Sequence, residues 1–246
     1  MRVLLLRLEG PLMSFGDVKV DARNPTRDHP GLGQMTGLLG NALGYDHADA
    51  DRLTRLQERL RVASRCEVAG TPLRDYQTVD LGQPFMQEGW TTRGQVEGRK
   101  GGTASDGTHI RQRHYHADRL QMVAVTLTPS DEFPTIDEVA AALDAPARPL
   151  FLGRKACLPS GRLNAGLIEA PTLHAALEQA PRDRRAATTF LSAWWPEDPA
   201  TTPPADSRVV AVVDERDWRG QVVVGRRLVR QGRVNPPLAS AEVAHV

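Results

Sequence analysis

Cations and aromatic rings alternate in the middle of the chain, and together they could bind single-stranded nucleic acid. Phe85 and Trp90 begin this stretch, and the five cations between residues 93 and 113 are accompanied there by two carboxylates, Glu97 and Asp106. Cations can neutralise phosphates while rings stack on bases. A solvated loop whose charges bind nothing explains the composition equally well. The five cations are Arg93, Arg99, Lys100, Arg111 and Arg113.

A second basic cluster lies in a glycine-containing stretch further along the chain. Arg154 and Lys155 follow Gly153, and Arg162 follows Gly161. Glycine lets the backbone approach an anion closely, so amides as well as side chains could contact a phosphate there. The alternative interpretation is a tight, charged turn that binds no ligand.

Three residues at alternate positions have the chemistry of transition-metal ligands. In an extended strand, His114, His116 and Asp118 would point the same way. The sequence indicates no fourth ligand nearby. Histidines beside Arg113 and Tyr115 suit a surface that contacts RNA equally well. We therefore expect neither a metal site nor a cofactor.

General acid–base chemistry is a different use of the same region. A metal-independent endoribonuclease needs only positioned proton donors and acceptors. The residues that could supply them are Tyr76, Lys100 and one of His109, His114 and His116. The chain contains no Walker-type phosphate loop, dinucleotide fingerprint, zinc-protease motif or nucleophile elbow. We predict a non-catalytic protein and keep the endoribonuclease as the alternative.

Composition limits how the chain can bind nucleic acid. The 246 residues carry a formal net charge of +1 and are 40% hydrophobic, which is typical of a globular domain with a packed core. Binding through total positive charge is excluded, so a nucleic-acid site must be local. The apolar runs are too short to cross a bilayer, and we expect a cytoplasmic protein without membrane contact. Cys66 and Cys157 are expected to be reduced.

Hydrophobic periodicity predicts an α+β fold. Residues 2–8 are almost continuously apolar, as in a strand that is buried on both faces. Thr135 and Glu138 form a capping box that begins a helix. The elements follow the βαββαβ order of the modified ferredoxin-like (RRM-like) fold. Strands are expected at residues 2–8, 62–68, 120–128 and 151–158, and helices at residues 35–43, 49–60 and 135–145.

Two glycines lie inside the first expected helix. In a helix interior each glycine lowers helix stability by about 1 kcal/mol relative to alanine. Gly37 and Gly40 therefore indicate that another group approaches the helix backbone closely on their side. Tight packing on the sheet and close approach of a ligand phosphate account for them equally well.

An insertion and a C-terminal extension are added to this order. Residues 81–110 contain seven glycines and few large apolar side chains, so we expect an inserted β-hairpin thumb there. The segments expected around and after it are strands at 73–79 and 111–116, a helix at 173–179, a Pro-rich loop at 196–204 and additional strands at 208–213 and 221–224. We expect residues 1–235 to form one domain, followed by a loose tail at 236–246.

Several motifs carry a resemblance to one family. They are LLLRLEGPLMSFG (4–16), NPTRDHPG (24–31) with GLLGNALG (37–44), LRDYQTV (73–79), the spacing of Arg113, Tyr115 and Asp118, and FLGRKAC (151–157). In these motifs the chain resembles the CasD family, the RAMP-type subunit of the type I-E CRISPR complex Cascade. LRDYQTV is the most specific match. Two departures are Met13 and Phe15 near the family's Gln and Trp, and a Gly-Leu-Gly stretch at 31–33 in place of a Thr-Arg-Ser-like one.

The resemblance implies a subunit that grips the 5′ handle of the guide RNA, or crRNA, beneath the thumb. It implies neighbours in the backbone subunit CasC and the large subunit CasA, with target DNA contacted at most indirectly. Cutting of the precursor RNA belongs to another subunit, CasE, although a related type I-C subunit does cut RNA. The expected RNA-binding residues are Ser14, Phe15, Arg27, Arg74, Tyr76, Arg93, Arg99, Lys100, Arg111, Arg113, Tyr115, Arg154 and Lys155.

Overall fold

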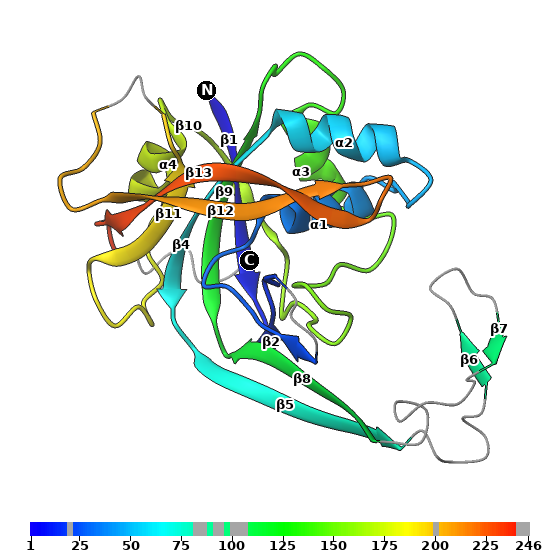
Figure 1. Ribbon diagram of the computed structural model, residues 1–246. Coiled ribbons are helices and arrows are strands. Elements are labelled where there is room, and N and C mark those ends of the chain that lie inside the picture. The colour runs from blue at the N-terminus through cyan, green and yellow to red at the C-terminus, as the bar shows by residue number, and fades with distance from the viewer. Residues whose placement is uncertain (19–21, 81–87, 91–95, 99–107, 199–201, 240–246) are drawn as a thin grey trace.

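The computed structural model describes residues 1–18, 22–80, 88–90, 96–98, 108–198 and 202–239. Within these ranges, a seven-stranded antiparallel sheet has the order β10-β1-β9-β4-β11-β13-β12 (Figure 1). Its strands are β1 (Arg2–Glu9), β4 (Leu60–Val68), β9 (Leu120–Leu127), β10 (Asn164–Glu169), β11 (Leu191–Pro196), β12 (Arg208–Asp217) and β13 (Val222–Val234). The helices are α1 (Leu32–Ala42), α2 (Ala50–Arg59), α3 (Ile136–Asp144) and α4 (Leu173–Gln179). The predicted α+β class is confirmed.

Both faces of the central strands are covered, which explains their unbroken apolar sequences. Leu4, Leu6 and Leu8 of β1 pack in the main core, to which α1, α2 and α3 contribute. Val3 and Leu5 face a second core that includes residues of α4. All of β9 is buried. Because alternate side chains of a strand point to opposite faces, the two-sided strands predicted at 2–8 and 120–128 are confirmed.

Close packing explains one of the two helical glycines. A Cβ on Gly40 would lie 2.6 Å from Leu53 Cδ2, so α1 could not approach α2 as closely with any larger residue at that position. A Cβ on Gly37 would lie 3.4 Å from the Trp218 ring, which is ordinary van der Waals contact. Gly40 is therefore explained by packing of α1 against α2 and not, as one alternative had it, against the sheet.

The strand expected at residues 151–158 is wrong. The chain turns there, because the Cys157 amide donates to the Arg154 carbonyl at 2.8 Å and the Leu152 amide donates to the Cys157 carbonyl at 2.7 Å. Leu152 and Cys157 are both fully buried, so the apolar residues that suggested a strand anchor the turn instead. β10, at Asn164–Glu169, takes the place beside β1.

The C-terminal part extends the sheet further than expected. β12 and β13 are both longer than the strands predicted at 208–213 and 221–224, and β11 was not predicted. Trp194 and Trp195 of β11 are buried in different cores. The first residues of the expected loose tail are held to the body, because the Arg182 backbone bonds to Pro237 and Ala239. Residues 240–246 lie outside the described ranges.

None of the helices in the described ranges combines the length and apolar character that spanning a bilayer requires.

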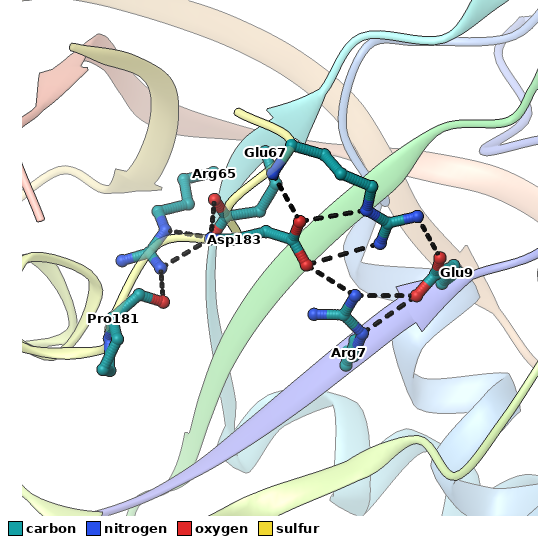
Figure 2. Close-up of polar contacts among 7 residues, drawn as sticks. Arg7, Glu9, Arg65, Glu67, Pro181 and Asp183 are labelled. Atoms are coloured by element: carbon teal, nitrogen blue, oxygen red, sulfur yellow. Dashed lines mark hydrogen bonds and ion pairs between the residues drawn. The ribbon is translucent and has the colours of Figure 1, made fainter. Parts of the chain in front are cut away.

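A buried ionic network joins the segment after α4 to the ends of β1 and β4 (Figure 2). Arg65 and Glu67 of β4 are fully buried side chains, and they pair at 2.6 Å. Arg65 also donates to the carbonyls of Leu177, Ala180 and Pro181, so it caps the C-terminal end of α4. Glu67 in turn accepts the Asp183 amide at 3.1 Å.

The second half of this network surrounds the Asp183 carboxylate. Arg7 donates to it at 2.7 Å and Arg185 at 3.0 Å, and both arginines also pair with Glu9. Burial alone would raise the pKa of Asp183, but the hydrogen bonds from Arg185 and Arg7 outweigh it and hold the pKa far below its usual range. The ionised form is therefore the one that stabilises the fold.

Acid should weaken this network. A carboxyl group whose pKa is lower in the folded state stabilises the protein above its unfolded pKa, which is about 4, and this contribution is lost as the pH falls towards the folded pKa. We expect the free energy of unfolding to fall below about pH 4, and Asp183→Asn to lower stability at pH 7 and flatten the acid limb. Urea unfolding at a series of pH values measures both. The exposed Asp206→Asn should keep the wild-type profile; an unchanged profile in Asp183→Asn would contradict the expectation.

Candidate nucleic-acid interface

A two-stranded ribbon extends from the body of the protein (Figure 1). It consists of β5 (Thr71–Asp80) and β8 (Thr108–Ala117), which pair antiparallel along their whole length. β2 (Leu12–Met13) and β3 (Arg23–Asn24) pair with the other edge of β8 and attach the ribbon to the body. β6 (Glu88–Trp90) pairs with β7 (Val96–Gly98). The strands predicted at 73–79 and 111–116 are confirmed, whereas most of the predicted thumb, 81–110, lies outside the described residues.

The ribbon divides the predicted RNA-binding residues between two faces. Directly paired residues share a face, and alternate residues along a strand point to opposite faces. In the register of β5 with β8, Arg111, Arg113 and Tyr115 lie on one face, which we call the Arg113 face. Arg74 and Tyr76 lie on the other, the Tyr76 face. A strand of RNA that runs along one face therefore does not contact both sets.

Arg154 joins the 151–157 turn to the Arg113 face. Its Nη1 donates to the His114 carbonyl at 2.7 Å, and its Nη2 donates to the Asn24 carbonyl at 3.0 Å. Its guanidinium carbon lies 4.6 Å from the centre of the Tyr115 ring, within cation–π range. Arg154 thus holds the turn against the base of the ribbon, and its guanidinium lies over Tyr115, which is on the same face as Arg113.

Glycine at position 153 allows this close approach. Its φ is +112°, which L side chains rarely adopt, and a Cβ there would lie 1.9 Å from the Ser14 carbonyl oxygen. The Ser14 hydroxyl also donates to the His114 carbonyl, at 3.3 Å. The 151–157 turn, the loop that contains Ser14 and the ribbon therefore meet at one point.

A groove of about 810 Å³ opens beside this meeting point. It runs from the loop at 14–18 and the turn at 153–155, past α1, to the hairpin between β12 and β13. Its walls combine cations with aromatic and aliphatic side chains, and Gly31, Gly33 and Gly37 line it as well. The predicted RNA-binding residues that line it are Ser14, Phe15, Arg27, Arg154 and Lys155.

Those five residues are not equally free to meet a ligand. Ser14 and Phe15 are each only 3% exposed, and Phe15 belongs to the main core. Arg27 donates to Asp17 and to the Val213 carbonyl, so it ties its loop to β12. Lys155 is exposed. Ser14, Phe15 and Arg27 are thus engaged in contacts within the protein. The side chain of Lys155 is exposed to a ligand in the groove.

The N-terminus of α1 is already occupied by a carboxylate. The Leu32 amide donates to Asp214 Oδ2 at 2.8 Å, and Arg227 donates to both oxygens of that carboxylate. Gly31 and Gly33 lie against Asp214, where a Cβ would be 3.0 to 3.1 Å from the nearest Asp214 atom. A helix N-terminus attracts anions because its amides lack partners. Here the Asp214 carboxylate accepts from the Leu32 amide and so provides an anion at this N-terminus from within the chain.

The other predicted residues that the structure describes differ in their exposure. Arg74 and Tyr76 are exposed, and Tyr76 is 55% exposed; Arg111 and Arg113 are half-buried. Tyr115 is buried beneath Arg154. Outside the described ranges lie Arg93, Arg99 and Lys100.

The histidines give little support to the ribonuclease hypothesis. His116 is buried, and its Nε2 lies 2.8 Å from the Arg27 carbonyl; burial lowers the pKa of His116. His109 lies on the face opposite Tyr76, whereas His114 and His116 share the Tyr76 face. Lys100 lies outside the described ranges. Within those ranges no three His, Cys, Asp or Glu residues are grouped as metal ligands.

Sequence reasoning missed part of the groove. Gln34, Arg216 and Trp218 all line it. Gln34 follows the Gly31-x-Gly33 pattern, which marks the close approach of α1 to β12 and was the available signal. Arg216 and Trp218 lie in the C-terminal part, where no motif could have indicated them. The guanidinium carbon of Arg216 lies 5.3 Å from the Trp218 ring centre.

Comparison with known proteins agrees with this architecture. A family model described as CRISPR-associated protein (Cas_Cas5) matches residues 3–230. The chain is 33% identical over 175 residues to the CRISPR system Cascade subunit CasD of Escherichia coli (strain K12), covering 68% of this chain and 71% of that protein.

Two solved structures share the fold. A chain of a CRISPR RNA-guided surveillance complex superposes with a TM-score of 0.71 at 24% identity, covering 98% of this chain and 95% of that one. The crystal structure of a Cas protein superposes with a TM-score of 0.63 at 23% identity, covering 96% and 98%. With a family model that matches nearly the whole length and a relative one-third identical, the chain belongs to the CasD family of CRISPR Cascade subunits.

Proposed function

We propose that this chain is a non-catalytic RNA-binding subunit of a CRISPR surveillance complex and that it holds the 5′ handle of the guide RNA. The observation that carries the proposal is the joint at Arg154. Arg154 contacts the ribbon at His114 and Tyr115 and also lines the groove. The proposed path of the RNA runs from the Arg113 face past this residue into the groove. Membership of the CasD family supports the role as a subunit.

Phosphate contacts dominate the proposed binding mode. Arg111 and Arg113 project from the ribbon, and Lys155 is exposed on the turn beside the groove. Cations in a row neutralise successive phosphates and fix the position of a strand without reading its sequence. The Tyr115 ring is covered by Arg154 and cannot stack on a base. Any base stacking along this path must therefore involve other aromatic side chains. The net charge of +1 fits such a local site.

The body fits a modified ferredoxin-like fold. The order β10-β1-β9-β4, antiparallel throughout, is the arrangement that two interleaved βαβ units produce. α1 and α2 connect β1 to β4, and α3 lies between β9 and β10. We propose one domain over residues 1–235, with the thumb inserted between β5 and β8. The proposed setting is the cytoplasm, with CasC and CasA as neighbours and target DNA at most indirectly contacted.

Crosslinking tests the proposed path. In the assembled complex with guide RNA that carries photoreactive nucleotides in its 5′ handle, crosslinked peptides should come from β8 and from the 151–157 turn. These segments bear the Arg113 face and Lys155. Mass spectrometry of the digested complex identifies the peptides. Crosslinks confined to α4, which packs on the opposite face of the sheet from α1, would contradict the proposal.

A further inference from the structure

Arg27 lies in the wall of the groove, and a carboxylate of the same wall holds it. Its Nε donates to Asp17 Oδ1 at 2.9 Å, and its Nη2 donates to the Val213 carbonyl at 2.5 Å. The side chain of Arg27 is 13% exposed and that of Asp17 is 40% exposed. Both residues line the groove. Asp17 is therefore the anion that Arg27 contacts in the free protein, and a ligand in the groove can reach this pair.

One nitrogen of the Arg27 guanidinium remains open. None of the described residues accepts a hydrogen bond from Nη1, and this nitrogen is not among the unpaired atoms that the protein seals from solvent. It lies near Gly31, where a Cβ would be 3.6 Å from it. Arginine presents its N–H donors in a planar fork, and carboxylates and phosphates are the anions that fit it. Arg27 thus keeps a donor for an anion in the groove.

Few contacts besides Arg27 hold Asp17 in place. Its Oδ1 also accepts from the amide of the next residue, Val18, whose side chain is exposed. The preceding residue, Gly16, has a φ of +64°, and a Cβ there would meet no atom within 4 Å. Phe15, by contrast, is buried in the main core. Asp17 can therefore move away from Arg27 without disturbing the core.

A phosphate is a stronger partner for Arg27 than this carboxylate. An ion pair that is partly exposed contributes little, because water screens it and because two side chains must be ordered to form it. Phosphate oxygens accept short, charge-assisted hydrogen bonds from arginine. An RNA strand that is already held by Lys155, which lines the same groove, presents its phosphates to Arg27 at a high effective concentration. The exchange of Asp17 for a phosphate is then favourable.

We propose that Arg27 is a phosphate-binding residue that Asp17 occupies in the free protein, and that a phosphate of the bound RNA displaces this carboxylate. The inference rests on the proposed RNA-binding function and adds a competitor from within the chain. Because the competitor is already in place, a free anion gains little by binding to Arg27. A strand that is held elsewhere along the groove displaces it readily.

A double-mutant cycle tests the exchange. The probe is labelled single-stranded RNA with the repeat-derived 5′ end of the guide, and fluorescence anisotropy follows its binding to the full-length protein. Asp17→Asn should raise affinity about three-fold, because the competing charge is removed. Arg27→Gln should lower affinity about ten-fold, because one charged hydrogen-bond donor to the phosphate is lost. When Arg27→Gln is already present, Asp17→Asn should have no further effect.

The groove supplies a matched control for the loss of one negative charge. Asp46 also lines it, but the Asp46 carboxylate accepts from the Ala48 amide, at 2.7 Å, instead of from a cation. Asp46→Asn should therefore raise affinity much less than Asp17→Asn does. A second measurement leaves Arg27 unchanged. In NMR spectra of the wild-type protein, the N–H resonance of Arg27 Nε should shift when RNA is added, because its acceptor changes from a carboxylate to a phosphate.

Each outcome separates this inference from the proposed function. If Asp17→Asn and Asp46→Asn raise affinity equally, or if Asp17→Asn keeps its effect without Arg27, the gain comes from net charge alone. The inference is then overturned while the function stands. A loss of affinity in Asp17→Asn, or an Arg27 Nε resonance that RNA does not move, overturns it as well. If the wild-type protein binds no RNA, alone or in the complex, the proposed function itself fails.

Discussion

Replacing Arg113 and Arg154 together with alanine should weaken binding of the guide RNA by about 100-fold at moderate salt. Arg113 places a positive charge on the ribbon and Arg154 places one at the groove, and Arg154 also holds these two parts together. Each phosphate contact contributes about one unit to the slope of log affinity against log salt, so the slope should fall by about two units. Fluorescence anisotropy with a labelled RNA at several salt concentrations measures both quantities.

The ribbon supplies a matched control for this prediction. Arg74 is an arginine of the same ribbon on the Tyr76 face, so Arg74→Ala removes the same charge from the opposite side. We expect a loss of affinity several times smaller than that of Arg113→Ala alone. Equal losses of affinity for Arg74→Ala and Arg113→Ala would show that the RNA does not bind one face of the ribbon in preference to the other. If the double variant keeps the wild-type salt slope, neither arginine contacts a phosphate of the RNA.

Arg65→Ala should be the most destabilising single change in the network of Figure 2, lowering the free energy of unfolding by about 3–5 kcal/mol. The substitution leaves the Glu67 carboxylate buried without its cation. It also removes the donor from the carbonyls of Leu177, Ala180 and Pro181. Urea unfolding followed by circular dichroism measures the loss.

Two further variants isolate the cause. Arg61→Ala removes an exposed arginine from the same strand and should change stability by less than about 1 kcal/mol. The double variant Arg65→Met with Glu67→Leu removes both charges, so it should be less destabilised than Arg65→Ala alone. If the double variant is the less stable of the two, the unpaired carboxylate is not the source of the loss.

The central strands of the fold were predictable because their sequence signals are local. Residues 2–8 and 120–128 are apolar on both faces, and Thr135 with Glu138 makes the capping box observed at the start of α3. Residues 151–158 are equally apolar, but Gly153 and the bond from Cys157 to Arg154 turn the chain back on itself. Periodicity does not distinguish a buried strand from a buried turn of the same length.

The sequence indicated which segments contribute to the site, but it did not indicate how their side chains are arranged in space. LRDYQTV indicated the ribbon, but the choice of face depends on the register between β5 and β8, which are separated along the chain by the thumb. Likewise, the engagement of the α1 N-terminus by Asp214 depends on a residue more than 180 positions away. The Gly31-x-Gly33 pattern points to the region of Gln34, but the unpaired side-chain oxygen of Gln34 results from tertiary packing and could not be predicted from the sequence.

The ten paired residues of β5 extend roughly 33 Å at about 3.3 Å per residue, and their base is fastened to the body through β2, β3 and Arg154. Because the ribbon is fixed at its base, its length determines the distance from the body at which a molecule bound to its tip is held. Removing one residue pair would move that molecule closer by one step and rotate it to the other side of the ribbon. Deletions of two pairs would therefore be tolerated better than deletions of one.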